Sequence, residues 1–125
     1  MATEYVEGTI LLNGTPVEVA QVTFTPKDAQ NGMSATGYTD KSGKFKLTAS
    51  QGDAGKGTLA GEYVVTVNKI TWITEKRVVS GEEQQVPVTE VNHIPKVYMS
   101  EETTPLKATV AAGKNTFAFQ LEGTP

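Results

Sequence analysis

The chain has no cysteine, one histidine (His93), one arginine (Arg77) and one tryptophan (Trp72) in 125 residues. The missing cysteine excludes disulfides, thiolate nucleophiles and cysteine-based metal sites. No apolar run approaches the roughly 20 residues that a membrane-spanning helix needs. The first five residues, Met-Ala-Thr-Glu-Tyr, lack the basic and apolar regions of a signal peptide, so the residues alone fit either a cytoplasmic protein or one whose leader has been removed.

Positive charge is also scarce. The net charge is −3 with a pI near 5.1, and the eleven Lys and Arg residues are scattered along the chain. No basic field is therefore available to attract nucleic acid, and we expect no nucleic-acid partner. With 38% hydrophobic and 20% charged residues, the composition predicts one globular domain spanning residues 1–125.

Alternation with the period of a strand recurs along most of the chain, and helical periodicity is absent. Asn13-Gly14 and Asp40-Lys-Ser-Gly43 are typical of hairpin turns. The pattern predicts an all-β fold, an antiparallel β-sandwich of about seven strands. The expected strands are 6–12, 20–24 (ended by Pro26), 35–39, 44–48, 63–68, 106–110 and 117–121, with loops at 27–34 and 50–60.

The segment from residue 70 to residue 105 fits this pattern least well. It begins as a continuation of the preceding strand and then becomes polar and acidic at 80–85. We expect either a long loop or an extra hairpin here, in which Val78-Val79 would pair with residues 86–88 around Gly81. A connection of this length is usually functional or mobile.

Three ordered patterns carry a family resemblance. They are Gly8 with Asn13-Gly14, Pro16-Val17 and Ala20-Gln-Val-Thr-Phe24; then Thr39-Asp-Lys-Ser-Gly-Lys-Phe45; then Gly61-Glu-Tyr-Val-Val-Thr-Val67. A late element, Pro95-Lys-Val-Tyr98 followed by Thr104-Pro-Leu106, precedes a closing hairpin. The chain resembles the carboxypeptidase-regulatory-like, or transthyretin-like (prealbumin-like), β-sandwich family, in its short single-domain version from exported bacterial proteins, notably of planctomycetes.

The resemblance covers nearly the whole chain in order, with two departures. Val19 stands where the family usually has glycine, and residues 70–92 have no clear counterpart. It implies a Greek-key fold and a non-enzymatic structural or interaction module. It also implies an extracytoplasmic location, in the periplasm or at the cell surface, as a lipoprotein whose leader has been removed. A lipid anchor, absent from this chain, would be the only membrane contact.

Catalytic, cofactor and metal sites are not expected. His93 has no second histidine or cysteine to act with, and the related hydroxyisourate hydrolases use several His and Arg residues that this chain lacks. The stretch 52–58 resembles a phosphate-binding loop but has the wrong spacing and precedes a strand. Asp40 offers too few oxygens for calcium. No lysine on the first strand is available for an isopeptide bond to Asn115.

Trp72 and Tyr98 are the candidate ligand or partner surface. Inward residues of the preceding strand are odd-numbered, so Trp72 points away from the core unless a bulge intervenes. We expect the long segment to fold over and bury it; the alternative is an exposed aromatic platform with Tyr98. The expected function is a structural or protein-interaction role at the cell envelope, and the alternative is a carbohydrate-binding module. The partner would be a protein or a glycan.

Overall fold

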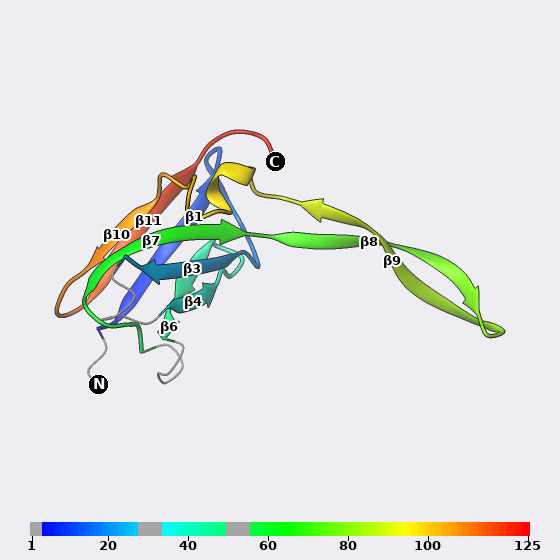
Figure 1. Ribbon diagram of the computed structural model, residues 1–125, viewed down its shortest axis with the longest axis horizontal. Coiled ribbons are helices and arrows are strands. Elements are labelled where there is room, and N and C mark those ends of the chain that lie inside the picture. The colour runs from blue at the N-terminus through cyan, green and yellow to red at the C-terminus, as the bar shows by residue number, and fades with distance from the viewer. Residues whose placement is uncertain (1–3, 28–33, 50–55) are drawn as a thin grey trace.

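The computed structural model describes residues 4–27, 34–49 and 56–125. Two sheets pack face to face as an all-β sandwich, and a third, two-stranded sheet projects from one end (Figure 1). The expected sandwich is therefore confirmed. The expected loop at 27–34 and the Gly-rich stretch at 50–60, which includes the rejected phosphate-loop segment, lie largely outside the described residues.

The smaller sheet is built on β1 (Val6–Leu12). On one side β1 pairs with β11 (Asn115–Leu121), and on the other with β2 (Thr15–Pro16) and β5 (Lys44–Lys46). The larger sheet has the order β10 (Lys107–Val110), β7 (Gly61–Asn68), β3 (Gln21–Pro26), β4 (Ala35–Tyr38) and β6 (Thr48–Ala49). A short 3-10 helix, η1 (Lys96–Tyr98), precedes β10.

The core follows the predicted alternation. Val6, Gly8 and Ile10 of β1 are buried, as are Val22 and Phe24 of β3. In β7 the odd-numbered residues face inward as expected. Phe24 lies at the centre of an aromatic cluster, with its ring centroid 5.8 Å from those of Tyr63 and Phe117 and 6.1 Å from that of Phe119. The edge contacts with Phe117 and Phe119 of β11 join the two sheets, whereas Tyr63 lies beside Phe24 in the same sheet.

Gly8 is required by close packing rather than by a turn. A Cβ atom at this position would lie 2.6 Å from the ring of Phe45 and 2.8 Å from the carbonyl oxygen of Phe117. Only glycine lets the Phe45 ring lie this close to the β1 backbone. The first residue of the family-like pattern is therefore explained by its packing.

The strand pattern differs from the prediction in three places. The single strand expected at 44–48 is two strands, because the chain changes sheets at buried Leu47: β5 pairs with β1, and β6 pairs with β4. The strand expected at 20–24 is β3, Gln21–Pro26, which ends at Pro26 as expected but includes the proline. One pair, β1 with β11, is parallel, in contrast to the antiparallel expectation.

Val19 adopts the left-handed conformation, with φ 56°. Its N–H donates to the carbonyl of Thr39, and the next N–H, of Ala20, donates to the Thr39 hydroxyl. The bend therefore has the shape that a glycine would give, although a β-branched residue occupies it.

Candidate functional site

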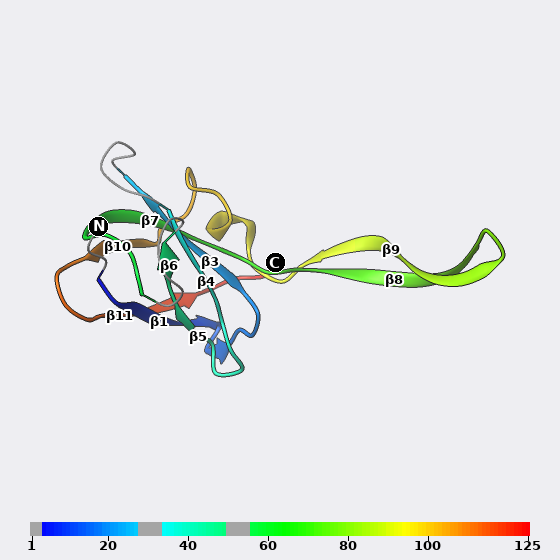
Figure 2. The ribbon, with the colours of Figure 1, turned by 90° about the horizontal axis from the view of Figure 1, so that it is seen from below.

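The segment 70–92 forms an ordered hairpin that projects from the sandwich. Its strands are β8 (Ile70–Val79) and β9 (Glu82–Asn92), and β8 continues the direction of β7 with only Lys69 between them. Figures 1 and 2 show that the ribbon extends away from both sheets in both views. We call this hairpin, residues 70–92, the arm.

The turn of the arm fixes its register. Ser80 and Gly81 have φ of 54° and 83°, which is the backbone of a two-residue type I′ turn. Val79 consequently pairs with Glu82, and Val78 pairs with Glu83. The expected hairpin is present, but the expected pairing of the two valine runs is wrong, because a two-residue turn places Val86 opposite Glu75 instead.

The arm exposes apolar side chains to solvent, and they are concentrated on one strand. Every residue of β8 is exposed. Among the described residues, five of the eight exposed large hydrophobic residues are on β8, and none is on β9. These are Ile70, Trp72 (56% exposed), Ile73 (54%), Val78 (72%) and Val79 (42%). They are distributed over both faces of the ribbon, and their concentration on one strand makes β8 the strongest candidate contact surface.

The two strands of the arm are joined to each other at their base, and the residue that follows them is anchored in the core. The N–H of His93 donates to the carbonyl of Lys69 at 2.9 Å, and its Nε2 lies 2.8 Å from the hydroxyl of Thr71. Ile94 is completely buried, and its N–H donates to the side chain of Asn92. The two strands of the arm therefore leave the sandwich from fixed points, and His93 has a structural role at this junction.

The two residues of the candidate surface do not come together. Tyr98 is only 7% exposed, and its hydroxyl accepts the N–H of Glu122 at 2.9 Å and donates to the carbonyl of the same residue at 3.4 Å. Tyr98 thus fixes the chain after β11 and cannot serve as a surface platform, so that prediction is corrected. The expected burial of Trp72 is also wrong, because the arm extends away from the body instead of folding over it.

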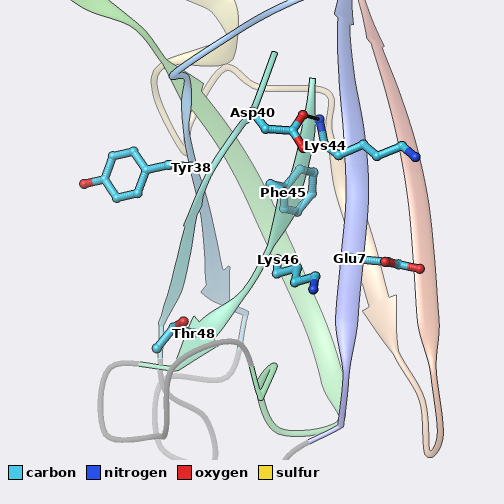
Figure 3. A pocket seen from close by; sticks show the side chains of 7 residues that line it. All are labelled: Glu7, Tyr38, Asp40, Lys44, Phe45, Lys46 and Thr48. Atoms are coloured by element: carbon cyan, nitrogen blue, oxygen red, sulfur yellow. Dashed lines mark hydrogen bonds between the residues drawn. The ribbon is translucent and has the colours of Figure 1, made fainter. Parts of the chain in front are cut away.

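A shallow groove of about 400 Å³ lies where β5 crosses between the sheets, lined by Glu7, Tyr38, Asp40, Lys44, Phe45, Lys46 and Thr48 (Figure 3). Asp40 accepts the N–H groups of Ser42 and Lys44 and so closes the predicted turn. In Figure 3 the ring of Tyr38 points away from the other side chains. The groove residues therefore do not converge on a common point.

Glu7, at the other side of this groove, is engaged within the protein. Its carboxylate forms an ion pair with Lys114 at 3.2 Å and accepts from the hydroxyl of Tyr5. The contact with Lys114, followed by that with Tyr5, lowers the pKa of Glu7 below its ordinary 4.5. These contacts stabilise the ionised form of Glu7, which acts as the ion-pair partner of Lys114.

Within the residues that the structure describes, no three His, Cys, Asp or Glu side chains lie close enough to hold a metal ion. Over the same residues, no helix has the length and hydrophobicity to cross a bilayer.

The sequence reasoning missed the asymmetry between the two strands of the arm. A sequence signal that could have revealed it is the contrast between two neighbouring runs. Ile70–Val79 lacks Gly and Pro, whereas Glu82–Asn92 is acidic and contains Pro87.

Comparison with known protein families finds no match, and no curated protein is similar to the chain. A solved structure with partial similarity is a 9R-lipoxygenase from Cyanothece PCC8801. It is 12% identical, covers 96% of this chain and has a TM-score of 0.44. The chain matches only 16% of the length of that lipoxygenase. This level of similarity supports no inference about function.

Proposed function

We propose that the protein is a non-enzymatic interaction module in which the sandwich is a rigid support and the arm is the element that contacts a protein partner. The observation that carries the proposal is the concentration of exposed apolar residues on β8. A rigid scaffold that presents binding residues on a projecting element is a common arrangement in recognition proteins. The resemblance to short exported β-sandwich domains supports an extracytoplasmic setting at the cell envelope.

The exposed backbone of the arm strengthens this proposal. Within the described residues, β8 and β9 pair only with each other. Each strand therefore offers a row of outward backbone donors and acceptors, to which an extended segment can add. A two-stranded ribbon is also of marginal stability in water, so a partner that extended the sheet would be stabilising.

Photo-crosslinking tests this function. A photo-reactive residue is placed at Ile73 on the arm, and a matched one at exposed Lys107 on the body. We expect discrete crosslinked protein products from the arm position in the source cells. Excess unmodified protein should compete them away, and a variant lacking residues 70–92 should not. Equal crosslinking from both positions would contradict an arm-based function.

A carbohydrate-binding function remains the second proposal, because the ring of Trp72 is exposed and could stack on a sugar. It is weaker because Tyr98 is buried and provides no second stacking surface. Affinity electrophoresis against a glycan panel, with the wild type and Trp72→Ala, tests it. Retardation that the substitution abolishes would favour this function over protein recognition.

A further inference from the structure

The two edges of the arm differ in composition and regularity. β9 carries Glu82, Glu83 and Glu90, together with Pro87, which lacks a backbone donor, and the register shifts beside Pro87. Charge, proline and irregularity are the devices that prevent an edge strand from pairing with another chain. β8 contains no proline, its three charged residues (Glu75, Lys76 and Arg77) are of mixed sign, and it carries all the large exposed hydrophobic residues of the arm.

Symmetry restricts how two β8 strands could pair. Residues directly opposite each other in an antiparallel pair have side chains on the same face, and successive residues alternate faces. Under a two-fold axis normal to the sheet, residue i can therefore face residue j of the second copy only when i and j are both odd or both even. The residue at the centre of the paired strands must then lie opposite the same residue of the second copy.

The register centred on Lys76 is self-complementary. It places Ile73 opposite Val79 of the second copy and Glu75 opposite Arg77, and each pair occurs twice on the same face. In the single chain, Glu75 and Arg77 are joined by an ion pair at 3.2 Å, so both charges already lie on this face. Apolar and opposite-charge cross-strand pairs are each worth about 0.2–1 kcal/mol.

The other face of this register is also compatible. Thr74 lies opposite Val78 of the second copy, and Trp72 lies diagonally from the same valine, within reach of a large ring. The two Lys76 side chains meet at the axis, where long exposed ammonium groups can extend apart into solvent. In contrast, the neighbouring register centred on Glu75 places two short carboxylates opposite each other and pairs Ile73 with Arg77.

From these observations we infer that the partner of the arm is a second copy of this chain, joined through the β8 edges in antiparallel register about Lys76. The result is a continuous four-stranded sheet with the order β9-β8-β8-β9, whose outer edges are the two protected β9 strands. This inference rests on the proposed function of the arm as the contact element. It assigns that contact to a homodimer.

The bodies do not obstruct this dimer. Ile70 lies six residues from Lys76, so the two arm roots are twelve residue steps apart, or about 40 Å at roughly 3.3 Å per residue. Figures 1 and 2 show the arm extending clear of the sandwich, which leaves room for a second ribbon alongside it. The two sandwiches would lie at opposite ends of the shared sheet.

The absence of native cysteine makes disulfide trapping a clean test. In Lys76→Cys the two thiols face each other across the axis, with Cα atoms about 4.5–5.5 Å apart, within disulfide range. The matched control is Gln85→Cys, because Gln85 pairs with Lys76 but lies on the protected strand. We expect covalent dimer under mild oxidation to form about tenfold or more faster for Lys76→Cys than for Gln85→Cys, since pairing raises the local thiol concentration.

A second pair of variants tests the contact without cysteine. Ile73→Lys adds charge to the β8 edge, and Thr89→Lys adds the same charge to the opposite residue on β9. Analytical ultracentrifugation should show a concentration-dependent dimer for the wild type and Thr89→Lys and a monomer for Ile73→Lys. Retained thermal unfolding of the sandwich in all three shows that the body is intact.

The inference is overturned if the wild type remains monomeric at high micromolar concentration, or if both cysteine variants crosslink at the same rate. Faster crosslinking of Glu75→Cys than of Lys76→Cys would overturn the register. A monomer whose arm still crosslinks to another protein would overturn the homodimer and leave the proposed function standing. Equal crosslinking from the arm and the body would overturn the proposed function itself.

Discussion

Val19 occupies a backbone conformation that its side chain disfavours. A left-handed residue costs roughly 1–2 kcal/mol when it is not glycine, and a β-branched residue is among the poorest choices. The side chain is 60% exposed, so little packing offsets this cost. The sequence identified the position as unusual only through the family resemblance, because no rule of alternation or turn composition marks a valine as left-handed.

Val19→Gly should therefore stabilise the protein. Relief of backbone strain exceeds the added flexibility of glycine in the unfolded chain, and we expect a gain of about 1 kcal/mol. Urea denaturation monitored by far-UV circular dichroism measures it. Val64→Gly, at a half-exposed position within β7, is the control and should destabilise. A loss of stability in Val19→Gly would show that the bend is not strained.

The two aromatic residues show the limits of residue-level prediction. Alternation correctly placed Trp72 off the core face, but whether a long segment folds back or extends depends on interactions that a single sequence does not display. Tyr98 looked suitable for a surface because tyrosine is amphipathic. It is instead buried, and its hydroxyl accepts the N–H of Glu122, which is 24 positions away along the chain.

At the scale of elements, prediction succeeded where a strand lies wholly within one sheet and has one buried face. β1, β3 and β7 are such strands, and their inward residues follow the period of two. It failed at Leu47, where the chain changes sheets, because the alternation stays unbroken while the pairing partner changes from β1 to β4. Periodicity reports which face is buried and not which strand lies alongside.

The arm should be separable from the sandwich. Its ends are adjacent, since the N–H of His93 donates to the carbonyl of Lys69, so residues 70–92 can be replaced by an Asn-Gly turn. We expect the melting temperature to change by less than about 5 °C, which corresponds to roughly 1 kcal/mol in a domain of this size. Differential scanning calorimetry measures this. Phe24→Ala, which removes the central ring of the core, should cost about 3–5 kcal/mol and serves as the contrasting variant.

At the scale of the whole molecule, stability is divided between a packed sandwich and a ribbon without a core of its own. The core strands β1, β3 and β7 are buried on one face, whereas every residue of β8 is exposed. Local opening requires less free energy where few apolar contacts are broken. The arm is therefore the part of the described structure whose order depends most on a partner.

Hydrogen exchange should resolve this division. In dilute solution, amides of the arm should exchange at least about a hundredfold faster than those of β3 and β7, because the ribbon opens without global unfolding. At high concentration, added protection should appear on β8 in preference to the outward amides of β9. Uniform protection of the arm and the sandwich in dilute solution would contradict the division.

The parallel pairing of β1 with β11 has a mechanical consequence. These two strands contain the first and last strand residues of the described chain, Val6 and Leu121, and they are joined along seven residue pairs from Val6↔Asn115 to Leu12↔Leu121. Because the strands run in the same direction, tension applied between the two ends of the chain pulls them past each other along their length. The backbone hydrogen bonds of the pair are then loaded together in shear instead of opening one at a time. A molecule tethered at one end and pulled at the other would thus resist force at this pair of strands, while its arm remained outside the line of tension.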